Sequence, residues 1–250
     1  MPFLIAIFLL FSAIPAAASP SGKDIIEKVI HQPSPDQALI TVRMTLTGQN
    51  AGVRQLTTYF KRINGKANSV IKFQEPADYR GAGLLVIEKA DGHMDRRIRF
   101  QGQRRVRRLP SGSQTGSFLN TDFSYEDLDG HRNIESDTHK LLREEKLNGQ
   151  DCYVVETIPS PDSGSAYKRI VQWIRKDNYV PIQVEFYQDG AQPVKRLVAE
   201  EVKNIDGYWV TTKSRMTTLA AGTSTELDVV KTDFKTNIPD STFTDQFLLE

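Results

Sequence analysis

Hydrophobic and polar residues alternate along most of the chain, and a period of two residues is typical of β-strands. The stretch ALITVRMTLTG, residues 38–48, shows this alternation clearly. Four apolar residues fall on one face of this predicted strand: Ile40, Val42, Met44 and Leu46. Similar runs of β-branched and aromatic residues follow, separated by Gly, Asn and Asp, which are turn residues. We therefore predict about ten to twelve strands.

Two short segments break this alternation. In SGKDIIEKVIHQ, residues 21–32, the apolar residues recur at helical spacing. Residues 240–249, DSTFTDQFLL, predict a second short helix at the C-terminus. The chain is therefore mainly β, with two or three short helices.

The predicted strands follow one another through short turns, of which Asn148-Gly149 is the clearest hairpin signal. Serial hairpins favour an antiparallel meander over a parallel α/β sheet. The chain contains no Pro/Ser-rich linker or break in composition that would mark a domain boundary. We predict one domain over residues 19–250, a curved sheet or half-open antiparallel β-barrel with the short helices on its concave side.

The N-terminus predicts export. Residues 3–14, FLIAIFLLFSAI, are apolar but too few to span a bilayer, and small residues follow them. We predict a signal peptide over residues 1–18, cleaved between Ala18 and Ser19. The lack of Lys or Arg before the apolar run leaves an uncleaved N-terminal anchor as the alternative.

The formal net charge of the 250-residue chain is only +1, and residues 1–18 carry no charged side chain. A neutral, exported chain disfavours nucleic-acid binding. The chain has one cysteine, Cys152, so it can form no intramolecular disulfide. Its stability must come from a buried core.

No pattern of catalytic residues is evident. The four histidines lack zinc-binding spacing: His31, His93, His131 and His139. The nucleophile motifs of serine hydrolases are missing. Cys152 lies within an apolar strand and is interpreted as a structural residue. We therefore predict no enzyme, cofactor or metal site; a hydrolase that uses Cys152 or a histidine is the less favoured alternative.

Charge is concentrated between Arg96 and Arg108, where seven arginines occur without an acid. On a strand these arginines would fall on both faces, which a half-buried sheet does not require. The guanidinium fork suits phosphate, which favours a lipid head group as the ligand of these arginines. A protein partner is the alternative ligand. The candidate residues for such binding are Arg104, Arg105, Arg107 and Arg108.

The acidic segment TDFSYEDLDG, residues 121–130, follows this basic stretch. The closeness of opposite charges favours ion pairs between the arginines and Asp122, Glu126 and Asp127. The segment lacks the spacing of a calcium-binding loop. Ser124 and Asp127 have the spacing of a capping box, which predicts one helical turn at this point.

Three blocks resemble the outer-membrane lipoprotein-sorting protein family, related to the LolA and LolB carriers and often found beside transporters of the resistance-nodulation-division type. They are PADYRGAGLLVIE (76–88), RRVRRL (104–109) and GSFLNTDFSYEDL (116–128). The chain departs from the family pattern before RRVRR, where HMDRRIRFQGQ replaces an aromatic and a Pro-Ala turn.

The resemblance implies a half-open barrel whose apolar concave face holds acyl chains of lipid or lipoprotein in the bacterial periplasm, without a cofactor. It also implies transient membrane contact and an inner-membrane transporter as a possible partner, and we expect a monomer. Eight residues are candidates for the lipid cavity: Ile40, Val42, Met44, Leu46, Phe60, Phe73, Leu85 and Ile87. The same residues could instead form a dry packed core.

A second hypothesis is a non-catalytic envelope protein that docks on such a transporter through the arginine hairpin. The sequence leaves the choice between the two hypotheses open.

Overall fold

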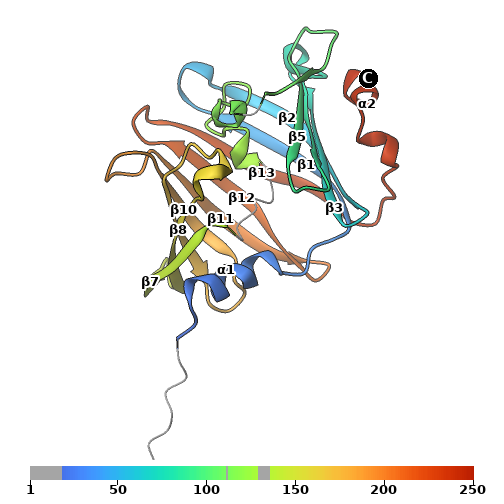
Figure 1. Cartoon of the computed structure of the whole chain (residues 1–250). Helices are drawn as coiled ribbons and strands as arrows, with labels where there is room; N and C mark the ends of the chain where they lie inside the picture. Colours follow the sequence, from blue (N-terminus) through green and yellow to red (C-terminus); the bar gives the residue numbers. More distant parts are fainter. Residues whose placement is uncertain (1–18, 111, 129–135) are drawn as a thin grey trace, which may run out of the picture.

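The computed structural model describes residues 19–110, 112–128 and 136–250. Within them, thirteen strands form one antiparallel sheet that curves into an open half-barrel (Figure 1). The fold class is as predicted, and the strands slightly exceed the predicted number because the two-residue β6 is one of them. The strands are β1 (Gln37–Leu46), β2 (Gly52–Ile63), β3 (Lys66–Glu75), β4 (Gly83–Glu88), β5 (Met94–Arg99), β6 (Arg107–Arg108), β7 (Thr138–Leu147), β8 (Gln150–Ile158), β9 (Arg169–Arg175), β10 (Pro181–Tyr187), β11 (Lys195–Ile205), β12 (Tyr208–Thr218) and β13 (Thr223–Asp233).

The two ends of the meander meet in the middle of the sheet. The strand order is β6-β5-β4-β3-β2-β1-β13-β12-β11-β10-β9-β8-β7, so β1 pairs with both β2 and β13. Met44 lies opposite Arg54 on one side and Leu227 on the other. Strands β6 and β7 form the two edges and do not pair with each other, which leaves the half-barrel open.

Tight turns connect several of the strands. Asn148 and Gly149 both have positive φ, 51° and 80°, which confirms the predicted hairpin. Asn64-Gly65 and Asp206-Gly207 have the same backbone form. These dipeptides set the register of three hairpins through local chemistry.

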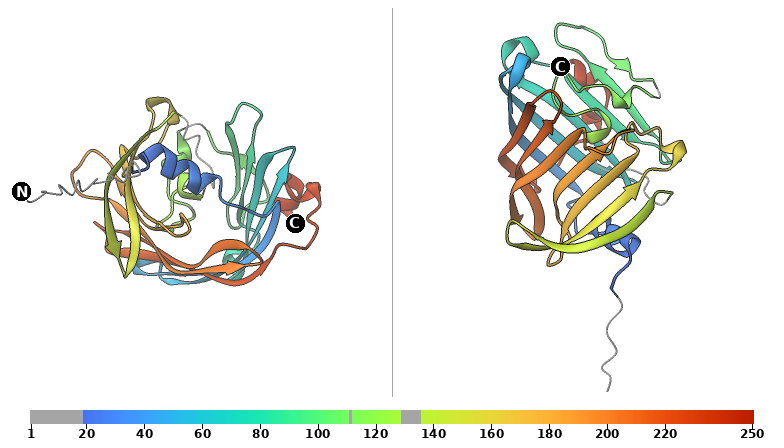
Figure 2. Two further views of the ribbon diagram at one scale, coloured as in Figure 1. Left: turned by 90° about the horizontal axis from the view of Figure 1, so that it is seen from below. Right: turned by 90° about the vertical axis from the view of Figure 1, so that its left-hand side faces the viewer.

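Helix α1 (Gly22–Ile30) lies on the concave side of the sheet, as predicted, and packs on β7 and β8 (Figure 2). Ser21 and Asp24 form a capping box at its start. Ile25 and Ile26 are buried against Val155 and Ile174. Within the described residues, no helix is long and apolar enough to cross a membrane. The predicted signal peptide and its cleavage site lie outside or at the border of the described residues.

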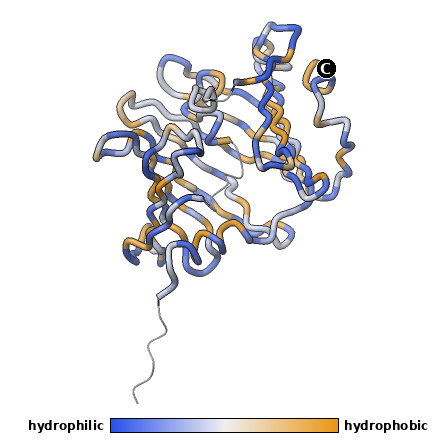
Figure 3. The backbone as a smooth tube through the Cα atoms, in the orientation of Figure 1, coloured by the Kyte–Doolittle hydropathy of each residue, from blue (hydrophilic) through white to orange (hydrophobic). Residues whose placement is uncertain are grey.

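Helix α2 (Asp245–Leu249), in contrast, packs on the convex face (Figure 2). Its buried residue Leu248 lies in one cluster with Val70 and Leu85. Four basic side chains from the sheet hold this helix and the turn before it: Lys61, Lys72, Arg97 and Arg99. Figure 3 shows apolar residues recurring along the strands beneath it.

Candidate functional site

The concave face of β1–β5 is apolar, and most of the predicted cavity residues lie on it. Val42, Met44, Leu46 and Phe73 belong to one buried cluster, and Ile40 packs against it. Phe60 shares this face because it lies opposite Ala38 in the register of β1 and β2.

Leu85 and Ile87 lie on the other face, beneath α2, so these two were placed on the wrong side of the sheet. Leu84 and Val86 take the concave positions of β4. Both faces of β4 are covered, so its four central positions, residues 84–87, are all apolar and the alternation that marks a face is lost.

Residues 116–128, here called the plug, fold back on themselves and lie on the concave face (Figure 2). Phe118, Leu119 and Tyr125 join the cluster of the sheet. The ring centroids of Phe73 and Phe118 are 5.8 Å apart. At this end of the concave face the side chains therefore form a packed core and not an open cavity. The sequence left these two possibilities open.

A buried arginine ties the plug to the sheet. Arg54 is 4% exposed; its Nη1 donates to the Leu119 carbonyl at 2.8 Å and its Nη2 to the Tyr79 hydroxyl at 2.9 Å. The guanidinium carbon also lies 3.9 Å from the centre of the Tyr79 ring. Burial lowers the pKa of Arg54. Its only signal in the sequence is its position on the same strand face as Leu56.

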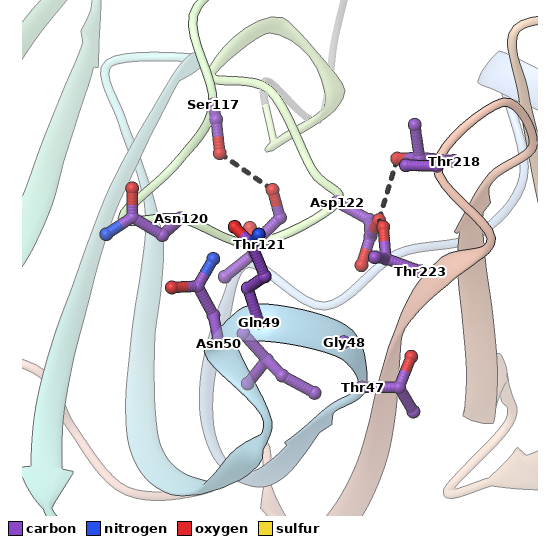
Figure 4. Close-up of a pocket in the computed structure, with 12 residues that line it drawn as sticks. Thr47, Gly48, Gln49, Asn50, Ser117, Asn120, Thr121, Asp122, Thr218 and Thr223 are labelled. Carbon is purple, nitrogen blue, oxygen red and sulfur yellow. Dashed lines mark hydrogen bonds between the residues drawn. The ribbon is translucent and has the colours of Figure 1, made fainter.

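A polar recess of about 540 Å³ lies where the plug meets the tips of two hairpins (Figure 4). In its wall, the buried Asp122 carboxylate accepts hydrogen bonds from the hydroxyls of Thr218, Thr223 and Thr225, at 2.6–2.7 Å. The uncharged side chains of Gln49 and Asn120 face the recess. This arrangement fixes the turn of the plug to β12 and β13.

The two other acids anchor the far end of the plug. Glu126 accepts from the Ser165 hydroxyl and from the Ala166 N–H. Asp127 pairs with Lys195 at 3.1 Å and accepts from the Tyr167 hydroxyl at 2.9 Å. Burial, with the adjacent Asp127, raises the pKa of Tyr167.

These contacts correct the predicted ion pairs. The partners described for Asp122, Glu126 and Asp127 come from β11–β13 and the segment before β9, because the plug crosses the concave face toward the C-terminal half. The predicted helical turn is present as a single 3-10 turn, Glu126–Leu128, and Asp127 accepts from the Ser124 N–H.

Six of the seven arginines of residues 96–108 separate into two groups, and the seventh, Arg96, donates to the Met94 carbonyl at 3.5 Å. Arg97 pairs with Asp95 at 2.8 Å and with Asp245 of α2 at 3.0 Å. Arg99 donates to the carbonyls of Leu248 and Leu249, and Arg108 pairs with Asp95. In contrast, Arg104, Arg105 and Arg107 are exposed, with no side-chain partner among the described residues.

Other apolar residues of the concave face are only partly buried. They extend from the plug-covered core across the middle of the sheet: Ile40, Phe60, Ile71, Val184, Leu197, Leu227 and Val229. These side chains form the part of the face on which an apolar ligand could lie.

The described residues contain no group of His, Cys, Asp or Glu that could hold a metal ion. His131 lies outside them. Cys152 is buried beside Val154 in a cluster on the convex side of β8, and burial raises the pKa of its thiol. A raised thiol pKa suits a structural cysteine and works against a nucleophile.

Comparison with known proteins supports the assignment of the fold. A model of a family of uncharacterized proteins matches residues 65–250. No curated protein sequence matches the chain. A DUF1329 family protein from Desulfovibrio piger is 26% identical with a TM-score of 0.85, over 91% of this chain and 97% of its own. A LolA superfamily protein from Nitrosomonas europaea, 23% identical, has the same fold with a TM-score of 0.70, over 92% of this chain and 100% of its own.

The similarity extends to a relative with a descriptive name. An outer membrane lipoprotein-sorting protein domain from Vibrio parahaemolyticus is 30% identical, with a TM-score of 0.84. The match covers 92% of this chain and 98% of the Vibrio domain. The chain therefore belongs to the outer membrane lipoprotein-sorting protein family, whose LolA-like fold it shares.

Proposed function

We propose that the protein is a periplasmic carrier that holds acyl chains of a lipid or lipoprotein on its concave face, without catalysis. The observation that carries this proposal is the set of partly buried apolar side chains on that face, among them Ile71, Leu227 and Val229. Each methylene removed from water contributes about 0.8 kcal/mol, so an acyl chain laid on these side chains would bind favourably.

The open sheet supports this proposal because a chain-like ligand needs an entrance. Strands β6 and β7 are separate edges, so the concave face is not enclosed by a closed barrel. The apolar run of residues 3–14, which we interpret as part of a signal peptide, supports export. The name of the Vibrio relative supports a lipoprotein as one class of cargo.

The proposal is tested by identifying what the protein carries. Protein purified from its own host would be analysed by native mass spectrometry and by lipid extraction, and then tested for uptake of a fluorescent fatty acid. We expect a co-purified lipid or lipopeptide mass and saturable uptake of the probe. Protein that is consistently empty and takes up no probe would contradict the proposal.

Two adjacent valines provide a matched pair of variants. Val229 packs against the concave cluster, whereas Val230, its neighbour at the bulge opposite β1, is 58% exposed. A Val229→Glu change places a charge on the concave face and should weaken probe binding at least tenfold. Val230→Glu should bind the probe like the wild type. Equal binding by both variants would place the ligand elsewhere.

A further inference from the structure

The three exposed arginines lie together at one edge of the half-barrel. Arg104 and Arg105 are in the connection between β5 and β6, and Arg107 is in β6 itself. This connection, residues 100–106, projects beyond the sheet (Figure 1). A Cβ atom added at Gly102 would meet no atom within 4 Å, so the surrounding space is open.

This edge adjoins the apolar concave face. Arg107 lies opposite Ile98, so the two side chains share a face, and Ile98 is fully buried in the concave cluster. Phe100 and Leu109, on either side of the three arginines, pack against that cluster. The exposed charge and the apolar face are therefore contiguous.

The other arginines of the segment do not contribute free charge in the same way. Arg97 and Arg99 hold α2, Arg108 is paired with the buried Asp95, and Arg96 donates to the Met94 carbonyl. Residues 96–110 contain no acid that could neutralise the remaining three. A chain with a formal net charge of +1 thus presents a local cluster of positive charge at the edge of its apolar face.

We propose that Arg104, Arg105 and Arg107 dock the protein on an anionic membrane surface, with their guanidinium groups against lipid phosphates. This inference rests on the proposed carrier function, since it brings the concave face next to the bilayer that supplies or receives an acyl chain. Guanidinium groups bind phosphate oxygens in a bidentate way. Each basic residue near an anionic surface strengthens binding about fivefold.

The composition of this edge favours a membrane over a protein partner. Stable protein interfaces are centred on large apolar or aromatic side chains that become buried. The exposed large hydrophobic residues of the described chain lie elsewhere: Ile30, Val53, Leu142, Ile158, Trp209 and Val230. Charge without such an anchor fits electrostatic attraction to a lipid surface.

The experiment measures binding to vesicles. The chain without residues 1–18 would be mixed with sedimentable vesicles of phosphatidylethanolamine with 30% phosphatidylglycerol, and with vesicles lacking phosphatidylglycerol. We expect binding to the anionic vesicles only, weakened by raising the salt concentration. The triple variant Arg104→Gln, Arg105→Gln, Arg107→Gln should bind about 100-fold more weakly.

A charge-matched control separates the position of the charge from its amount. Lys140, Lys168 and Lys231 are exposed and lie on β7, next to β9 and on β13. Changing all three to Gln removes the same charge, and this variant should bind like the wild type. Equal binding by the arginine variant and the wild type, or equal loss in both variants, would overturn the proposal.

A protein partner gives a different result. If the wild-type protein does not bind protein-free anionic vesicles but crosslinks from position 105 to a purified membrane transporter, the proposal of docking on lipid is wrong. Uptake of the fluorescent fatty acid in solution keeps the two proposals separate. If the wild-type protein takes up the fatty acid but does not bind vesicles, only the docking proposal is contradicted. If it binds vesicles but takes up no fatty acid, only the carrier proposal is contradicted.

Discussion

Single buried charges position the plug on the sheet. Arg54 donates a hydrogen bond to the carbonyl of Leu119, and Asp122 accepts hydrogen bonds from three threonine hydroxyls of β12 and β13. A buried charge is costly unless it is hydrogen bonded, and both Arg54 and Asp122 have hydrogen-bond partners. Each residue therefore specifies one placement of the plug over an otherwise non-directional apolar surface.

Replacing Asp122 by Ala should destabilise the protein by roughly 2 to 4 kcal/mol, because three buried or half-buried hydroxyls lose their acceptor. The free energy of unfolding in urea measures this effect. Asp189→Ala, at an exposed position, is the control and should change stability by less than about 0.5 kcal/mol. Equal stability of the two variants would show that the threonine contacts contribute nothing.

Asp95 should make stability depend on pH at the acid end. Burial works against its charge, but the hydrogen bonds and charges of Arg97 and the charge of Arg108 outweigh burial and lower the pKa of Asp95. A lowered pKa in the folded state adds stability above the unfolded value near 4, and this stability is lost as the pH falls through the folded pKa.

Asp95→Asn should therefore cost most at pH 7, and its deficit should shrink as the pH falls below about 4, the unfolded value. Urea unfolding across this range measures the difference between variant and wild type. Hydrogen bonds from Thr236 and Lys235 lower the pKa of Asp233 to about 2, and this group is the same in both proteins, so its contribution cancels in the comparison. A deficit that is constant with pH would contradict the role of Asp95.

At the scale of elements, α2 is stable only because of the surface beneath it. A helix of five residues does not form alone in water. Leu248 is 0% exposed, and the Phe247 ring meets Tyr59 edge to face, with centroids 5.1 Å apart. The convex surface of β3–β5 would otherwise expose Leu85 and Val70.

Leu248→Ala should reduce the free energy of unfolding by about 2 to 5 kcal/mol, since it empties a fully buried site. Gln246→Ala, on the exposed side of the same helix, should leave stability nearly unchanged. Thermal unfolding compares the two, and binding of a hydrophobic dye at room temperature should rise for Leu248→Ala alone. A mild effect at Leu248 would mean that α2 is dispensable.

At the scale of the whole molecule, the central β1–β13 pair joins both halves of the chain into one sheet. We therefore expect a single cooperative unfolding transition. Both tryptophans, Trp173 and Trp209, lie in the C-terminal half, so their fluorescence reports on that half, whereas far-ultraviolet circular dichroism reports on all strands. The two urea curves should coincide; separate midpoints would show that the halves unfold independently.

The sequence predicted those features that depend on near neighbours. Helix α1, the Asn148-Gly149 turn and the strand of residues 38–48 are encoded by spacing and turn chemistry. The faces of β4 could not be predicted, since the unbroken apolar run of residues 84–87 shows no alternation. The partners of Asp122 could not be predicted either, because Thr218 and Thr225 approach it only after the chain has closed the middle of the sheet.

The position of β1 in the sheet also determines the order in which the strands can pair during folding. β1 is the first strand to be synthesised, yet one of its two neighbours, β13, is the last. Until β13 arrives, one edge of β1 has no partner and its apolar face remains uncovered on that side. Contacts between such distant segments form slowly. The sheet can therefore be completed only after β13 has been synthesised, and a chain destined for export, as proposed above, would stay unfolded until then.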